Sequence, residues 1–307
     1  MNLPESVRIV EVGPRDGLQN EAARVATADK IAFVDALTKA GHQTIEVSAF
    51  VSPKWVPQMA DAAQVFAGIQ RQPGVTYTAL VPNLAGLAHA REAQVGEVAI
   101  FAAASDTFSE RNINQSVAES LHAYAAVCIE AQRLGIRVRA YVSTAFGCPF
   151  EGPVPVETVA RVAGQLIDMG AYEVAVGDTI GSAHPGQVPV VLEAVERRVP
   201  LSKIALHFHD TRGTALVNVY AALQMGVTTF DSSAGGLGGC PYAPGATGNL
   251  ATEDLIYMLD GLGIRTGVSL EGIIAASRGI EPHVGHPLPS RVYRTGGDGP
   301  EDRRRGT

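Results

Sequence analysis

Residues 8–21 read RIVEVGPRDGLQNE, and this stretch distinguishes between the two architectures that the rest of the chain allows. RIVEVG (8–13) is a short apolar run typical of a buried β-strand. In an open, doubly wound sheet, the turn after the first strand carries closely spaced glycines that receive a phosphate. Here the turn PRDGLQNE (14–21) is charged and has no Gly-x-Gly pattern. The first strand and its turn therefore favour a barrel.

The remainder of the chain alternates short apolar runs with helical patterns. Strands are predicted at 8–13, 43–50, 75–82, 97–104, 137–146, 172–179, 203–210 and 227–234. Helices are predicted to begin near Thr27, Met59, Leu84, Ser116, Val156, Pro185, Thr214 and Thr252. The strands show little alternation, as expected of parallel strands that are covered on both faces. Eight strand–helix units in about 250 residues predict an α/β fold of the TIM (β/α)8 barrel type.

The chain is predicted to form a single domain. The barrel would occupy about residues 7–262. A C-terminal extension over about residues 263–307 contains one more helical pattern at 269–280, which we expect to pack on the outside of the barrel. The Gly- and charge-rich tail GGDGPEDRRRGT (296–307) is expected to be frayed.

Charge and composition exclude several classes of partner. The 307 residues carry a formal net charge of −7, whereas a surface that binds nucleic acid needs clustered Lys and Arg. An anionic substrate would therefore need local positive charge or a metal. We predict no targeting segment at the N-terminus and no membrane-spanning run. The three cysteines are too few for a disulfide framework, which favours a reducing compartment and a cytoplasmic protein.

A TIM barrel places its chemistry at the C-terminal ends of its strands, and polar side chains of this chain fall at those ends. They are Arg15, Asp16, Glu46, Asp178, His207, His209, Asp210 and Asp231. Within IALHFHDTRG (204–213), His207 and His209 are two residues apart. They therefore face the same side of the strand, roughly 6.6 Å apart along it. Such a pair favours a metal or acid–base site over two core histidines.

The identity of the metal depends on the remaining ligands. With Asp16, the two histidines suit an octahedral Mg²⁺ or Mn²⁺ that keeps open positions for substrate oxygens. Zinc is the alternative, because Cys240 could be a fourth, soft ligand. Zinc is less favoured if Cys240 takes part in the chemistry instead.

The segment AGGLGGCPYAPGATGN (234–249) directly follows the last predicted strand. We interpret it either as a flexible loop or as a lid from which Cys240 reaches into the site. Cys148, which follows the fifth strand, is a weaker candidate for chemistry, and Cys128 is expected to be a small core residue. A reducing compartment disfavours a disulfide between Cys148 and Cys240.

Six segments of the chain resemble 3-hydroxy-3-methylglutaryl-CoA lyases, which belong to a wider superfamily of TIM-barrel metallolyases. They are EVGPRDGLQNE (11–21), IEVSAFVSPKWVPQMAD (45–61), ERNINQSVAES (110–120), GDTIG (177–181), HFHDTRGTAL (207–216) and GGLGGCPYAPGATGNLATEDLIYML (235–259). The resemblance covers roughly residues 5–265. The Arg-Asp-Gly and His-x-His pieces are shared with isopropylmalate and homocitrate synthases, whereas SPKWVPQM and GGLGGCP are more specific to the lyases.

The resemblance implies a reverse Claisen cleavage of 3-hydroxy-3-methylglutaryl-CoA to acetyl-CoA and acetoacetate, with Mg²⁺ or Mn²⁺ as the cofactor. The implied metal ligands are Asp16, His207, His209 and Asn249. Arg15 would face the thioester carbonyl and stabilise the enolate oxygen, and Gln19 would also contact the substrate. A homodimer is the implied assembly, and leucine degradation is the implied pathway.

The same resemblance implies roles for further residues in proton transfer. Cys240 would take part in it, and Glu46 and Asp178 would be supporting or acid–base carboxylates. Either His207 or a carboxylate would deprotonate the 3-hydroxyl. Glu253 would be a further supporting carboxylate or, alternatively, a first-turn acid that the helix dipole favours.

Three positions depart from the family pattern, and all three concern the substrate. Ala49 and Ala175 stand where the better-known lyases carry hydroxyl residues, and Arg212 stands where they carry tyrosine. We interpret Arg212 either as a contact to a substrate carboxylate or CoA phosphate, or as an arginine that faces solvent.

The residues leave four functions open. The first is the lyase reaction above, and the second is the same chemistry on a related 3-hydroxy-acyl-CoA. The third is a Claisen-condensing synthase, which we disfavour because such synthases often carry a long C-terminal regulatory region. The fourth is a non-catalytic barrel that binds a ligand. It would be expected to have lost metal ligands or Cys240, and none of them is missing here.

Overall fold

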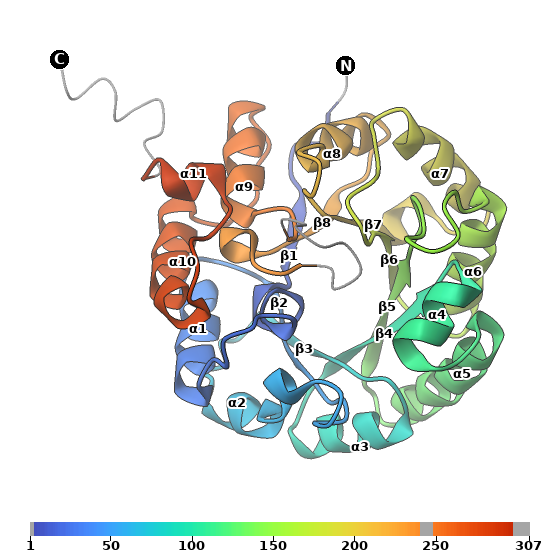
Figure 1. The fold of residues 1–307 in the computed structure, drawn as a ribbon, viewed down its shortest axis with the longest axis horizontal. Coiled ribbons are helices and arrows are strands. Elements are labelled where there is room, and N and C mark those ends of the chain that lie inside the picture. The colour runs from blue at the N-terminus through green and yellow to red at the C-terminus, as the bar shows by residue number, and fades with distance from the viewer. Residues whose placement is uncertain (1–2, 240–247, 297–307) are drawn as a thin grey trace.

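The computed structural model describes residues 3–239 and 248–296, and eight parallel strands in it close into a barrel in chain order. The strands are β1 (Arg8–Glu11), β2 (Thr44–Ala49), β3 (Thr76–Leu80), β4 (Glu97–Ala103), β5 (Arg137–Ser143), β6 (Glu173–Asp178), β7 (Ile204–Phe208) and β8 (Thr229–Ser232). Figure 1 shows the helices in a ring around the strands. The predicted TIM barrel is confirmed.

The helices lie where the alternating pattern placed them, with four differences. They are α1 (Thr27–Lys39), α2 (Ala62–Gly68), α3 (Leu84–Glu92), α4 (Asp106–Ile113), α5 (Val117–Arg133), α6 (Val156–Asp168), α7 (Gln187–Glu196), α8 (Ala215–Gln224), α9 (Thr252–Gly261), α10 (Leu270–Val284) and α11 (Arg291–Arg294). Helix α2 begins later than Met59, because residues 57–59 form a separate short turn. Helix α7 begins two residues after Pro185. Helices α4 and α11 were not predicted. No helix within the described ranges is long and apolar enough to cross a membrane.

Several strands end earlier than predicted. The clearest case is β5, which ends at Ser143 because Thr144 adopts a left-handed backbone conformation with φ of +59°. The strand therefore ends three residues before the predicted end at 146. Strands β2 and β6 are buried along their whole length, as expected of parallel strands that are covered on both faces.

The described part of the C-terminal extension packs against the outside of the barrel. Helix α10 lies against α1 (Figure 1). Its N-terminus is capped by Ser269, whose Oγ accepts a hydrogen bond of 3.1 Å from the N–H of Gly272. The helix runs beyond 280 and ends at Gly285, whose φ of +79° few other residues adopt at low cost. The predicted frayed tail lies outside the described residues from position 297 onward.

The turn after β1 carries the first candidate residues of the site. Residues Gly13–Gly17 form a single wide helical turn in which the N–H of Gly17 bonds the carbonyl of Val12 at 3.1 Å. Wide turns of this kind are frequent at functional sites. Gly17 has no room for a side chain, because a Cβ there would lie 2.9 Å from the Cβ of Leu237. The turn therefore packs closely on the segment after β8 and holds Arg15 and Asp16 at the barrel mouth.

Candidate active site

His207 and His209 lie at the C-terminal end of β7 and face each other. Their Nε2 atoms are 3.2 Å apart, and both side chains are buried. The Nδ1 atom of His207 lies 3.3 Å from Oδ2 of Asp231. Because a carboxylate only accepts, Nδ1 carries the proton and Nε2 presents its lone pair to the mouth. Burial and the neighbouring His207 lower the pKa of His209 to about 4, so this imidazole is neutral at pH 7.

Asp16 and Asn249 join the two histidines in one group. Oδ2 of Asp16 lies 3.9 Å from Nε2 of His207 and accepts a hydrogen bond of 3.0 Å from Nδ2 of Asn249. The ligand atoms of Asp16, His207 and His209 all lie within 4.8 Å of one another. Burial opposes the charge of Asp16, but Arg15 and the two histidines hold the pKa of this carboxyl well below its usual range.

This group fits a divalent cation. Two nitrogens that bind one ion at about 2.1 Å and at right angles are about 3.0 Å apart, close to the separation of the two Nε2 atoms. Oδ1 of Asn249 is buried and has no hydrogen-bond partner among the described residues, although Nδ2 of the same amide has two. Two imidazole nitrogens, one carboxylate and one amide oxygen form a ligand set that such an ion accepts.

Arg15 and Glu46 form the second half of the site. Nη2 of Arg15 donates to Oε2 of Glu46 at 2.8 Å, and Nη1 donates to Oδ1 of Asp16 at 2.6 Å. The hydroxyl of Tyr141 also donates to Oε2 of Glu46, at 3.0 Å. Burial opposes the charge of Arg15, yet the two carboxylates raise its pKa further above its usual value. A permanent cation is thus held beside the metal ligands.

Asp178 and Asp210 are bound to the loops that follow their strands. Asp178 accepts hydrogen bonds of 2.9 and 3.0 Å from the N–H groups of Ser182 and Ala183. Its burial raises the pKa of this carboxyl to about 6 in spite of those bonds. Asp210 accepts from the N–H of Ala215 at 3.0 Å, at the start of α8. Both carboxylates therefore hold loops at the mouth, and neither belongs to the group of metal ligands.

The two other candidate substrate contacts also lie at the mouth. Gln19 is half-buried and lies two residues after the end of the turn that carries Arg15. Arg212 is exposed, and its Nη1 donates to the carbonyl oxygens of Ile180 and Gly181, both at 2.9 Å. These bonds hold the guanidinium against the loop after β6, beside the opening of the barrel.

Glu253 supports the segment after β8 instead of touching the metal ligands. Both of its carboxylate oxygens accept from the N–H of Gly235, at 2.9 and 3.0 Å, and Oε1 also accepts from the hydroxyl of Ser277. Glu11 holds the same segment through the N–H of Ala234 at 2.9 Å. Burial raises the pKa of Glu253 to about 7 and that of Glu11 to about 8.

The cysteines separate into different roles. Cys128 is buried in α5, and burial raises the pKa of its thiol to about 11, as expected of a core residue. Cys148 is also buried, and its Sγ lies 3.0 Å from Oγ of Ser105. Cys240, the main candidate for chemistry, lies outside the described residues.

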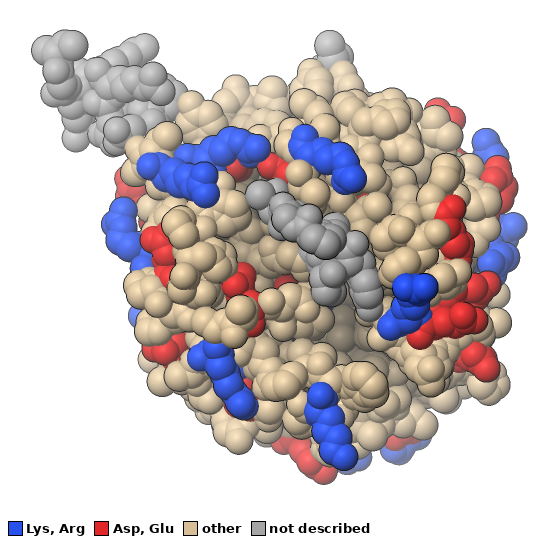
Figure 2. Space-filling view, viewed as in Figure 1, with Lys and Arg blue, Asp and Glu red and all other residues tan. Residues whose placement is uncertain are grey.

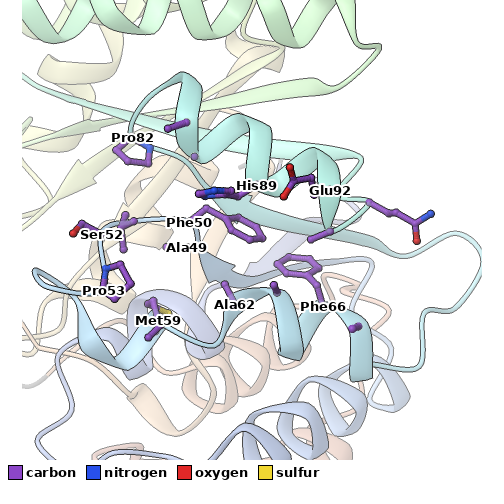
Figure 3. A pocket seen from close by; sticks show the side chains of 18 of the residues that line it. Ala49, Phe50, Ser52, Pro53, Met59, Ala62, Phe66, Pro82, His89 and Glu92 are labelled. Atoms are coloured by element: carbon purple, nitrogen blue, oxygen red, sulfur yellow. The ribbon is translucent and has the colours of Figure 1, made fainter.

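A pocket of about 810 Å³ lies outside the barrel, between α2 and α3 (Figure 3). None of the metal-ligand candidates lines it. Its wall is mostly apolar and includes Ala49, Phe50, Met59 and Phe66. The pocket therefore touches the end of β2, three residues after Glu46, but it is distinct from the group of metal ligands.

Sequence reasoning missed three polar residues inside the barrel. Arg139 and Tyr141 in β5 and Glu173 in β6 are buried, and all three belong to one hydrogen-bonded network. The signal was present in RVRAYVS (137–143), where Arg139 and Tyr141 are two apart and so share one face of a buried strand.

The fold and this site define a class, the TIM-barrel enzymes with a candidate divalent-metal centre at the mouth. Residues 6–280 match the family model described as HMGL-like. The chain belongs to the HMGL-like family. It is 54% identical to hydroxymethylglutaryl-CoA lyase of Bacillus subtilis, over 95% of this chain and 97% of that one.

The names of two further relatives include a substrate or a bound ligand. The chain is 54% identical to the 3-hydroxy-3-isohexenylglutaryl-CoA/hydroxymethylglutaryl-CoA lyase of Pseudomonas aeruginosa, over 96% of this chain and 98% of the relative. It is 38% identical, with a TM-score of 0.91, to the crystal structure of an HMG-CoA lyase from Acinetobacter baumannii in complex with coenzyme A and 3-methylmalate. That alignment covers 95% of each chain.

Removal of one metal ligand should abolish tight cation binding. Asp16→Asn and His209→Ala are each expected to weaken Mn²⁺ binding by at least about 100-fold, because even residues that only support a ligand account for 10–100-fold. Isothermal titration calorimetry on the purified full chain measures this. His89→Ala, which changes an exposed histidine of α3, is the matched control and should bind as the wild type does. Unchanged affinity in both ligand variants would contradict the assignment.

The raised pKa of Glu253 predicts a stability that falls with pH. Its value in the folded protein, about 7, exceeds the ordinary value of 4.5, so the folded state binds the proton more tightly. The free energy of unfolding therefore falls as pH rises from 4.5 to 7, by up to about 3 kcal/mol from this group.

Urea unfolding of Glu253→Gln at pH 5 and pH 8 tests this, because the variant cannot lose that proton. Its stability should fall less with pH than that of the wild type. Glu271→Gln, at an exposed position in α10, should keep the wild-type slope. Equal slopes in all three proteins would show that Glu253 is ionised in the folded state throughout this range.

Proposed function

We propose that this protein is a divalent-metal-dependent carbon–carbon lyase that cleaves 3-hydroxy-3-methylglutaryl-CoA to acetyl-CoA and acetoacetate. The observation that carries the proposal is the buried Arg15, a permanent cation that donates to Asp16 within the group of metal ligands. A reverse Claisen cleavage needs this combination, since negative charge develops on two oxygens in turn. The lyases to which the chain is similar bear the same activity in their names.

The reaction begins with loss of the proton of the 3-hydroxyl and ends with protonation of the enolate carbon. The hydroxyl loses its proton, the bond between C2 and C3 breaks, and the electron pair forms the enolate of acetyl-CoA. Asp16, His207, His209 and Asn249 would hold a divalent ion, whose charge would lower the pKa of the hydroxyl. The enolate then takes a proton on carbon.

Arg15 is the group that stabilises the enolate oxygen in this proposal. Nε of Arg15 is buried and has no partner among the described residues, so it remains a donor for a substrate oxygen. Gln19, on the same side of the mouth, would be a further contact to the substrate. Glu46 and Asp16 already hold the guanidinium of Arg15 in place, so it need not move during the reaction.

The proton of the 3-hydroxyl has two candidate acceptors. Glu46 keeps Oε1 buried without a partner in the described part of the chain, and it is the better candidate, because His207 could accept the proton only at Nε2, the atom that the ion would occupy. Asp178 is a weaker candidate, because both of its oxygens already accept backbone N–H groups. We propose Cys240 as the donor to the enolate carbon, on the sequence alone.

Mg²⁺ or Mn²⁺ is the proposed cofactor, since the ligand set above contains only oxygen and nitrogen. The proposed partner is an acyl-CoA, and the Acinetobacter baumannii lyase, whose structure contains coenzyme A, supports a CoA thioester as the ligand. Figure 2 shows Lys and Arg side chains spaced around the edge of one face that has a hollow near its centre, and they would favour an anion on this acidic chain. A homodimer and a cytoplasmic location stay predictions from the sequence.

A second candidate is the same cleavage on a thioester with a longer apolar substituent at C3. The observation that favours it is Ala49 in β2, which lacks the hydroxyl usual in the family and so leaves more room beside the substrate. Ala175 in β6 is equally short and fully buried. The name of the Pseudomonas aeruginosa relative includes a longer substituent of this kind.

The direct test is acetoacetate release from 3-hydroxy-3-methylglutaryl-CoA, with a reductant, with and without Mg²⁺ or Mn²⁺. Release should require the ion, and His207→Ala and Cys240→Ala should each lower it by at least about 100-fold, as expected when a metal ligand or a group that moves a proton is removed. Cys128→Ala, in the core, is the control for loss of a thiol. No release from folded protein that binds Mn²⁺ would contradict the substrate, and thioesters with longer C3 substituents would be assayed next.

Arg212 is proposed to contact a carboxylate or phosphate of the substrate. Arg212→Tyr should raise KM for the thioester about 5–10-fold and leave kcat within about twofold, because a lost charge-assisted bond at the rim weakens binding alone. Arg265→Tyr changes an exposed arginine near the other end of the barrel and is the matched control. Unchanged KM and kcat for Arg212→Tyr would leave it as an arginine that only holds the loop after β6.

A further inference from the structure

Arg139 is a fully buried arginine in β5 that the proposed reaction does not use. It is among the largest side chains that are withdrawn from solvent, with 1% of its surface exposed. Its Nε donates to Oε1 of Glu173 at 2.7 Å, and its Nη1 donates to the hydroxyl of Tyr141 at 2.9 Å. Nη2 and Nη1 donate to the two oxygens of Asp231 at 2.7 and 3.2 Å. Four of its five N–H donors are therefore bonded inside the barrel.

One branch of this network leads to the metal ligands. Asp231, held on both oxygens by Arg139, lies 3.3 Å from Nδ1 of His207. A carboxylate bonded to the far nitrogen of a histidine fixes the orientation of the ring and the nitrogen that binds the metal. The orientation of His207 thus depends on where Arg139 holds Asp231.

The other branch leads to Arg15. Tyr141 accepts from Arg139 and donates its own proton to Oε2 of Glu46 at 3.0 Å. The same Oε2 accepts from Nη2 of Arg15 at 2.8 Å. Arg139 is therefore the residue at which the support of the metal ligands and the support of Arg15 meet.

We propose that Arg139 is a positioning residue that sets the affinity of the site for its divalent cation through Asp231 and the placement of Arg15 through Tyr141. Lysine cannot replace it fully, because one ammonium group cannot bond three partners in one plane as the guanidinium does. The claim about turnover rests on the proposed function, whereas the claim about cation affinity does not.

The first measurement is the Mn²⁺ affinity of the full chain, by calorimetry, with circular dichroism to confirm folding. Arg139→Met should weaken binding about 10–100-fold, and Arg139→Lys should recover part of that loss. Asp231→Asn should lose about as much as Arg139→Met, and the double variant should lose no more than the larger single loss, because both changes act through one contact. Arg137→Met, two residues away with a side chain that is 60% exposed, is the matched control.

The second measurement separates the two branches. Tyr141→Phe removes one hydroxyl, keeps all charges, and should leave Mn²⁺ affinity within about twofold while it lowers kcat about tenfold or more. Wild-type Mn²⁺ affinity in folded Arg139→Lys and Asp231→Asn would overturn the proposal, and so would additive losses in the double variant. If Arg139→Met does not fold, these two variants decide the question. If the wild type cleaves no thioester, the proposed function fails and the cation affinities still test Arg139.

Discussion

The parallel pairing of β1 with β8 is the constraint on which the site depends. It aligns Val10 with Asp231 and places the turn after β1 beside the segment after β8. Without this closure Asp16, which follows β1, and His207, on β7, would lie near opposite edges of an open sheet. Closure brings carboxylate, imidazole and amide ligands from distant parts of the chain to one mouth, where a TIM barrel carries its chemistry.

The interior of the barrel carries charge as well as apolar side chains, and the charges around Arg139 are paired. Arg139 lies among Glu173, Asp231 and Tyr141, and Arg8 extends the network from the other end of Glu173. Breaking one partner out of such a buried pair costs about 3–5 kcal/mol, whereas keeping the pair contributes little net stability. We therefore interpret the network as fixing the positions of side chains at the mouth. Its contribution to the net stability of the fold is small.

Much of the fold was predictable because strand and helix periods are local properties of the sequence. The eight strands and the position of the site followed from apolar runs and from His207 and His209 at i and i+2. Strand ends were less predictable, since the turn at Thr144 depends on a backbone conformation that no local pattern indicates. The roles of Arg139 and Tyr141 were missed because their partners lie on β2, β6 and β8, far away in the sequence.

The central claim is that one divalent ion is held by Asp16, His207, His209 and Asn249. The most direct measurement is a crystal structure of the protein grown with Mn²⁺, with an anomalous difference map recorded at the manganese edge. The account predicts one peak about 2.1–2.2 Å from Nε2 of both histidines, an oxygen of Asp16 and Oδ1 of Asn249. A map without a peak at this position, or with the peak on other residues, would contradict it.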